Sequence, residues 1–184
     1  AGVGSSSLSA TTASVTATLV GALGDIAATS DGTTMTAATR ETLVGTVTAS
    51  SIKGLNGLSG ADRSALAAQV SGGAVQGVGV LAKAGKADTG SAISSLATSS
   101  ATALGSLTGI DSAELTTISL AVQGSIEGEI DVLATDSALS INADTLKNTT
   151  ASGLQAGVNA SGVTGADPNS IAAPGTKGGT TADT

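Results

Sequence analysis

The sequence predicts an all-α protein, a bundle of about five to six helices built from small residues, followed by an extended C-terminal tail. Two observations support this fold class. Aliphatic side chains recur at the spacing that places them on one face of a helix. Residues that favour helix N-termini precede most of these aliphatic stripes. The high content of Thr, a residue enriched in strands, keeps an all-β fibre subunit as the alternative.

Six helical segments are predicted from the stripes and their start signals. The segments begin, in chain order, at Ser9, Thr36, Ser59, Asp88 or Thr89, Asp111 and Asn142. Their aliphatic stripes are Val15, Leu19, Leu23 and Ile26; Leu43, Val47 and Ile52; Leu66, Val70, Val78 and Leu81; Ile93, Leu96, Leu104 and Leu107; Leu115, Ile118, Val122, Ile126, Ile130 and Leu133; and Leu146, Leu154 and Val158. Gly-containing stretches near residues 30–32, 54–57 and 109 are predicted to end three of the helices.

Residues 115–134 fit two kinds of secondary structure. From Ile118 to Ala134, aliphatic residues, Ala or Gly occupy every even position, which is the pattern of a half-buried strand. Two of these residues are Gly, and each would weaken a helix by about 1 kcal/mol. The same residues also keep an i, i+4 row, so the period does not separate the two structures. Asp111 followed by Glu114 resembles a capping box and favours the helix, with the strand as the alternative.

The composition divides the chain into three parts. Residues 1–8 are predicted to be an N-terminal extension, residues 9–162 the helical domain and residues 163–184 a tail of Gly, Thr, Ala and Asp. Both prolines, Pro168 and Pro174, fall in this tail. We therefore expect the tail to be extended and to have no core of its own.

Small residues dominate the chain and restrict its chemistry. Ala, Thr, Gly and Ser fill 112 of the 184 positions, while His, Cys and aromatic residues are absent. The usual zinc ligands, a thiolate nucleophile and a Ser-His-Asp triad are thereby excluded. Seven basic residues against 14 acidic ones, with no aromatic side chains for stacking, argue against nucleic-acid binding. We predict a protein that is not an enzyme and has no catalytic, cofactor-binding or metal-binding residues.

Several short motifs suggest chemistry, but each has a simpler explanation. Ser50 and Lys53 have the Ser-x-x-Lys spacing of serine acylases, yet the companion motifs Ser-Asp-Asn and Lys-Thr-Gly do not occur. Residues 77–82 resemble a dinucleotide-binding loop, yet they lie inside a helical stripe. Gly72 and Gly73 most simply mark a close approach of two helices or sheets.

The acidic residues Glu127, Glu129 and Asp131 offer oxygen atoms of the kind that bind Ca²⁺. On a helix, however, only Glu127 and Asp131 share a face. A solvated polar face is therefore the preferred interpretation of these three acids.

Charge and apolar content together favour association of the chain. Charged residues make up 11% of the sequence, and the mean hydropathy is +0.33. The longest apolar runs are far below the roughly 18 to 20 residues of a transmembrane helix, so no transmembrane segment is predicted. The chain begins at Ala1 among small residues, as after removal of a signal peptide, and we expect a secreted, extracellular or cell-surface protein. Asn148 and Asn159 begin glycosylation sequons, and whether either is modified is left open.

Four segments of the chain resemble the secreted hydrophobic surface-binding proteins and cell-wall galactomannoproteins of filamentous fungi. The segments are residues 19–23, 58–66, 81–86 and 111–115, within a likeness that covers about residues 15–135. The resemblance implies a small all-α bundle that coats hydrophobic surfaces or holds a fatty acid. The aromatic residues of that family are missing here, and so is the Pro that follows its lysine pair, so no lipid-pocket residue is transferred.

Two functions from different classes fit the sequence. The first is a non-enzymatic structural or surface-coating protein that self-associates into a fibre, coat or adhesive layer. The second is an all-α carrier of a fatty acid or another apolar ligand. The expected partners are further copies of the chain, or an apolar surface or lipid, and not nucleic acid. Val78 and Ile126 are the candidate contact positions for self-association, and removal of the tail after Gly162 is expected to weaken assembly while leaving the helices intact.

Overall fold

The computed structural model describes residues 5–171 of the 184-residue chain, and the side chains of residues 11–171. This part of the chain is helical and contains no sheet, so the predicted all-α fold is confirmed and the all-β alternative is wrong. The helices are α1 (Ser5–Ala22), α2 (Ala37–Lys53), α3 (Gly60–Lys83), α4 (Thr89–Gly105), α5 (Ser112–Ala134) and α6 (Ala143–Ala160), followed by the 3₁₀ helix η1 (Pro168–Ser170). The ambiguous stretch 115–134 lies entirely within helix α5.

Side-chain caps set the starts of five helices. Each capping side chain accepts a hydrogen bond from a backbone N–H three residues later, which satisfies a donor that has no partner within the helix. The caps are Thr36, Ser59, Asp88, Asp111 and Asn142, and all five were predicted as starts. Helix α1 differs from the prediction, because it begins at Ser5 rather than Ser9 and ends at Ala22 rather than near residue 30.

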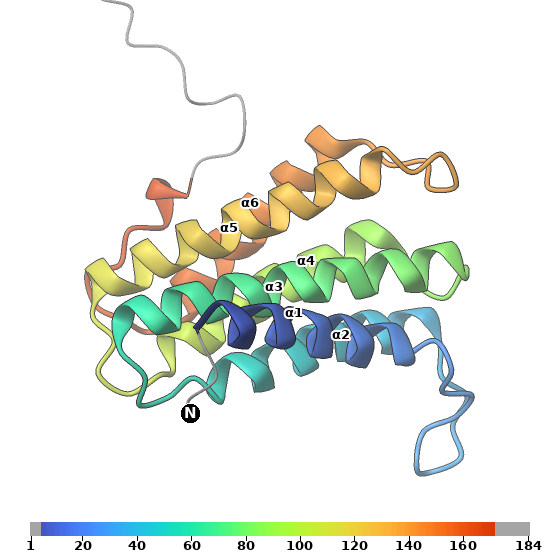
Figure 1. The fold of residues 1–184 in the computed structure, drawn as a ribbon, viewed down its shortest axis with the longest axis horizontal. Coiled ribbons are helices and arrows are strands. Elements are labelled where there is room, and N and C mark those ends of the chain that lie inside the picture. Colours follow the sequence, from blue (N-terminus) through green and yellow to red (C-terminus); the bar gives the residue numbers. More distant parts are fainter. Residues whose placement is uncertain (1–4, 172–184) are drawn as a thin grey trace, which may run out of the picture.

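The six helices form three antiparallel hairpins, α1–α2, α3–α4 and α5–α6, which are stacked in three tiers (Figure 1). Helices α1, α3 and α5 pack side by side and form one layer, here called the odd layer, while α2, α4 and α6 form the even layer. Within a layer the helices run parallel, since Gly72 of α3 lies against Ser125 of α5 and Gly79 against Leu133. The hairpin α3–α4 is therefore central in the stack, between α1–α2 and α5–α6.

Glycines set the distance between stacked helices. A Cβ atom on Gly77 of α3 would lie 2.6 Å from Val20 Cβ and 2.7 Å from the Ala17 carbonyl oxygen of α1, which is closer than real Cβ atoms come. Gly153 repeats this arrangement between α6 and α4, where a Cβ would lie 2.9 Å from Ala97 Cβ. The predicted close approach at Gly72 and Gly73 is confirmed as well, because a Cβ on Gly72 would meet Ser125 of α5 and a Cβ on Gly73 would meet the Ala13 backbone of α1.

Threonine hydroxyl groups are satisfied within their own helices. Thr16, Thr48 and Thr150 are buried, and each donates a hydrogen bond to the carbonyl four residues earlier. This local bond removes the cost of burying an unpaired hydroxyl and leaves the methyl group to pack in the core. The helical fold thus tolerates a residue with a preference for strands.

Arg40 of α2 fixes the loop that joins α1 to α2. Its side chain is buried, and its guanidinium donates to the carbonyl oxygens of Leu23 (2.9 Å), Ile26 (2.7 Å) and Met35 (2.8 Å). We expect Arg40→Met to lower the free energy of unfolding by about 3 kcal/mol, because three carbonyls lose a charged donor. Denaturant unfolding measures this loss, with Lys53→Met at the exposed end of α2 as the control; equal stability of the two variants would contradict the assignment.

Asp31 organises the tip of the same loop. Hydrogen bonds from the Thr29 hydroxyl and the Thr33 backbone N–H lower the pKa of Asp31 from 3.8 to about 2. A lowered pKa in the folded state stabilises the loop above pH 3.8, and this stabilisation disappears as the pH falls through about 2. Nuclear magnetic resonance titration of the Asp31 carboxyl carbon should give a midpoint near 2, whereas a midpoint near 3.8 would show that the two bonds do not form.

The first residues of the predicted tail pack against the helical bundle. The side chain of Ile171 is fully buried, and Gln155 Nε2 of α6 donates to the Ile171 carbonyl oxygen at 2.6 Å. The boundary placed after Gly162 therefore leaves a core residue outside the helical domain. Truncation at that point would also remove core packing, so a deletion meant to spare the helices has to start after Ile171. Residues 172–184 and residues 1–4 lie outside the described part of the chain.

Candidate association surface

Large aliphatic side chains are exposed on the odd layer. Val15 and Leu19 of α1, Val80 of α3, and Leu120 and Val132 of α5 are between 42% and 61% exposed. The other exposed large aliphatic residues of the described chain, Ile26 and Leu58, lie in the loops that follow α1 and precede α3. Scattered single apolar residues are ordinary on a protein surface, but here they share one layer.

The even layer presents hydroxyl and amide groups instead. Its exposed or half-buried polar residues are Thr42, Thr46 and Ser50 of α2, Ser91, Ser95, Thr98 and Thr102 of α4, and Asn148 and Ser152 of α6. Thr46 and Thr102 donate to carbonyls four residues earlier, as the buried threonines do. The odd layer also exposes hydroxyl groups, such as those of Ser14 and Thr18, so the two layers differ in their exposed large aliphatic side chains, which within the described helices lie on the odd layer.

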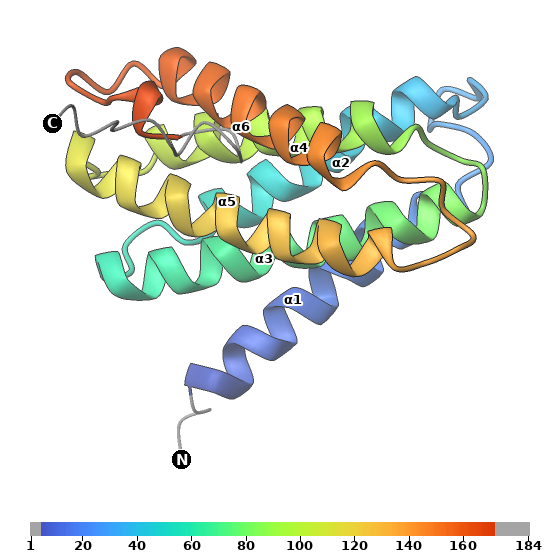
Figure 2. The ribbon, with the colours of Figure 1, turned by 90° about the horizontal axis from the view of Figure 1, so that it is seen from above.

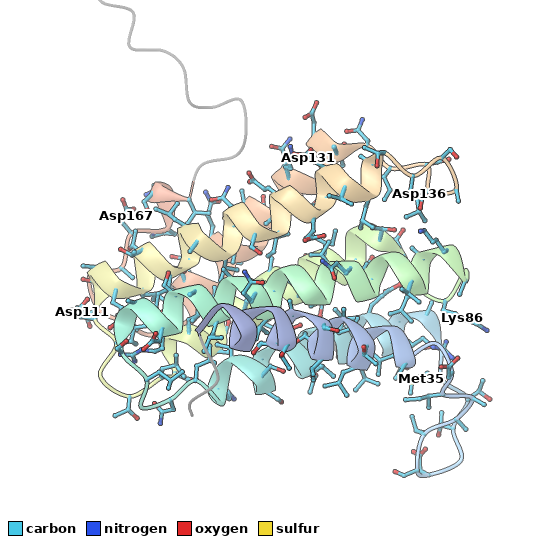
Figure 3. The ribbon with its side chains drawn as sticks, viewed as in Figure 1. Met35, Lys86, Asp111, Asp131, Asp136 and Asp167 are labelled. Carbon is cyan, nitrogen blue, oxygen red and sulfur yellow. The ribbon has the colours of Figure 1, made fainter. Side chains whose placement is uncertain are left out.

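The acids Glu127, Glu129 and Asp131 of α5 are held by three different partners. Gln123 Nε2 donates to Glu127 at 2.7 Å, Gln76 Nε2 of α3 donates to Glu129 at 3.0 Å, and Lys147 of α6 pairs with Asp131 at 2.6 Å. The hydrogen bond to Asp131 raises the pKa of Lys147. Figure 3 shows Asp131 near the C-terminal end of α5. The structure does not bring these carboxylates together, and the described residues contain no group of three or more acids arranged to hold a metal ion.

A row of uncharged residues lies on the outside of α5, beside Glu127 and Asp131, and the side chain of Asp131 is 60% exposed. Leu120, Gly124, Gly128 and Val132 follow one another at i, i+4 spacing and are all exposed. No atom lies within 4 Å of a Cβ placed on either glycine, so the space above both is open. The row consists of two glycines between two exposed aliphatic side chains.

The predicted contact positions are wrong. Val78 of α3 and Ile126 of α5 have no exposed surface and belong to the hydrophobic core. The even-numbered pattern in 118–134 contains two rows, because residues four apart share a face of a helix whereas residues two apart do not. Ile126 belongs to the inner row, and Leu120 and Val132 belong to the outer one.

The remaining sequence motifs fall at unremarkable places in the fold. Ser50 and Lys53 are exposed at the C-terminal end of α2, and residues 77–82 lie inside helix α3 rather than between a strand and a helix. Asn148 and Asn159, the two sequon residues, are exposed on α6.

An open groove of about 550 Å³ lies between the C-terminal halves of α1 and α3. Its lining includes Gly21 of α1 and Val80 of α3, with one acid, Asp25, and one base, Lys86. The volume is within the range of about 300 to 1,000 Å³ that is usual for small-molecule sites.

Helix α3 is long and apolar enough to cross a membrane by length and composition, although Gly, Ser and Gln interrupt its apolar runs. In this structure 67% of the apolar window of α3 is buried inside the bundle, as is typical of the central helix of a helical protein.

Comparisons with protein-family models, with curated proteins and with solved structures found no match for this chain. The resemblance to fungal surface-binding proteins therefore stays a prediction.

Proposed function

We propose that this chain is a non-enzymatic, secreted structural or surface-coating protein that self-associates into a fibre, coat or adhesive layer. The observation that supports the proposal is the difference between the two layers. The odd layer exposes Val15, Leu19, Val80, Leu120 and Val132, whereas the even layer presents hydroxyl and amide groups.

Burial of this surface supplies the driving force. Removal of apolar surface from water contributes roughly 25 cal/mol per Å², and small neighbouring residues let two such surfaces approach closely. Helix α1 offers no charge to oppose contact, since it contains no charged residue, whereas Glu127 and Asp131 flank the outer row of α5. The partners that fit are a second copy of the chain or another apolar surface.

A charge placed on the odd layer tests the proposal. Leu120→Lys puts an ammonium group on the outer row of α5, and Thr102→Lys puts the same group on the even layer, both at exposed positions. Concentration-dependent light scattering should fall for Leu120→Lys and stay at the wild-type level for Thr102→Lys. Equal scattering from both variants would contradict an association surface on the odd layer.

The groove between α1 and α3 supports a second candidate function, the carrier of a fatty acid or other apolar ligand. Its apolar walls and Lys86 suit a molecule with an aliphatic chain and a carboxylate. Gly21→Leu would fill the groove, because a Cβ there is already in ordinary contact with Val80 at 3.6 Å. Saturable binding of a fluorescent fatty acid that this variant abolishes would favour the carrier; undiminished binding would exclude this groove.

A further inference from the structure

At both ends of the stack, the helices of the odd layer expose large aliphatic side chains beside polar ones. In proteins built from stacked repeats, the terminal repeats carry polar outer faces that prevent further stacking. In the even layer, the chain segment that ends at Ile171 packs on α6 at one end of the stack (Figure 2). In the odd layer, α1 and α5 are the terminal helices, and both expose aliphatic side chains.

The outer side of α1 is the first of these ends. Ala13, Ala17 and Val20 form the side that packs on Gly73 and Gly77 of α3. Val15 and Leu19 lie on the other side of the helix, given 3.6 residues per turn, and each is about half exposed. This outer side carries no charge, because α1 has no acidic or basic residue.

The outer side of α5 is the second end. Ser125, Glu129 and Leu133 face α3, so Leu120 and Gly124 lie on the opposite side of the helix. Gly124 and Gly128 have the same spacing as Gly73 and Gly77, the glycines on which α1 packs in the same chain. Helix α5 thus carries an open pair of glycines, here called the seat, with the same spacing as the pair on which α1 packs in α3.

The acidic residues of α5 determine which surface of a second copy can pack on this seat. Helix α5 contains Glu114, Glu127, Glu129 and Asp131 and no basic residue, so two α5 helices in contact would bring acids together. Helix α1 is uncharged and meets the seat without repulsion. Resting on the self-association proposed above, we infer that copies stack head to tail, with Val15 and Leu19 of one copy on the Leu120–Gly124 row of the next.

The contact is heterologous, because the two surfaces that meet are different. Each copy in such a stack keeps one free α1 face and one free α5 face, so the contact does not close and a filament grows. The parallel order of α1, α3 and α5 would continue from one copy to the next.

The absence of Cys from the chain permits a direct test in the full-length protein. Two single-cysteine variants, Leu19→Cys and Leu120→Cys, are mixed and treated with a short bis-maleimide cross-linker. Head-to-tail stacking should give cross-linked dimers mainly from the mixture, with little dimer from either variant alone. Thr102→Cys, on the even layer, is the matched control and should give little dimer with either partner.

Each other outcome overturns the inference in a distinguishable way. Dimers from Leu120→Cys alone would indicate an α5–α5 contact, and dimers from Leu19→Cys alone an α1–α1 contact. Assembly by light scattering without a preferred mixed dimer would overturn the head-to-tail geometry and leave the proposed self-association standing. A protein that stays monomeric throughout would overturn both.

A second variant tests the seat without touching the core. Gly124→Leu fills open space on α5, so the circular dichroism spectrum should remain that of the wild type. The yield of the mixed cross-link should fall about tenfold, because the added side chain occupies the place of the incoming α1. An unchanged yield would contradict docking at Gly124.

Discussion

Gly77→Ala is expected to destabilise the fold by about 3 kcal/mol, whereas Gly124→Ala is expected to stabilise it by up to about 1 kcal/mol. The same methyl group is added in both variants, and both glycines lie inside helices. On Gly77 the new Cβ would overlap Val20 and the Ala17 carbonyl of α1, so α1 would have to move away from α3. On Gly124 the Cβ meets open space, and only the better helix propensity of Ala remains.

Denaturant unfolding measures whether each of the two variants lowers or raises the free energy of unfolding. Gly73→Ala should behave like Gly77→Ala, because its Cβ would fall on the Ala13 backbone, and Gly128→Ala should behave like Gly124→Ala. If Gly77→Ala were as stable as Gly124→Ala, this result would contradict the close contact assigned between α1 and α3.

Ile126→Lys is expected to unfold the monomer rather than merely dissolve an assembly. Ile126 has no exposed surface and packs in the core, so the variant buries an unpaired charge and removes aliphatic contacts. The expected loss is about 4 kcal/mol or more, comparable with the whole stability of many domains. Val78→Lys should have the same effect for the same reason.

Leu120→Lys is the matched control on the same helix, six residues earlier and on the outer row. It should keep the helical circular dichroism signal and the wild-type unfolding midpoint to within about 0.5 kcal/mol. A folded Ile126→Lys variant, or an unfolded Leu120→Lys variant, would invert the inner and outer faces assigned to α5.

The helices themselves could be predicted because their signals are local. Thr36, Ser59, Asp88, Asp111 and Asn142 cap helices through bonds to residues three positions away, so a short window of sequence contains the whole signal. The end of helix α1 was placed less accurately because it depends on Arg40, which binds Leu23 and Ile26 from the next helix.

The stacked tiers could have been recognised from the spacing of the caps. Ser59 and Asp111 are 52 residues apart, and so are Thr36 and Asp88. A repeated interval of this kind is a signal of repeated hairpins. The repeat is hidden at the level of individual residues, because small residues of similar type fill most positions.

The sequence predicts that an aliphatic association surface exists, but it does not predict which residues form that surface. Composition indicates that some aliphatic surface stays exposed, but an i, i+4 row does not reveal whether it faces the core or the solvent. On α5 the decision depends on how the buried row of Val122, Ile126 and Ile130 packs against the other helices of the bundle, which are distant in sequence. Burial of Ile171 likewise depends on α6, far from it in sequence.

Self-association through the exposed aliphatic side chains of the odd layer can be measured by sedimentation velocity of the full chain over a concentration range of about a hundredfold. The wild-type sedimentation coefficient is expected to rise steadily with concentration, Thr102→Lys to follow it, and Leu120→Lys to remain near the monomer value. A wild-type chain that sediments as a monomer at every concentration would show that the odd layer does not drive association.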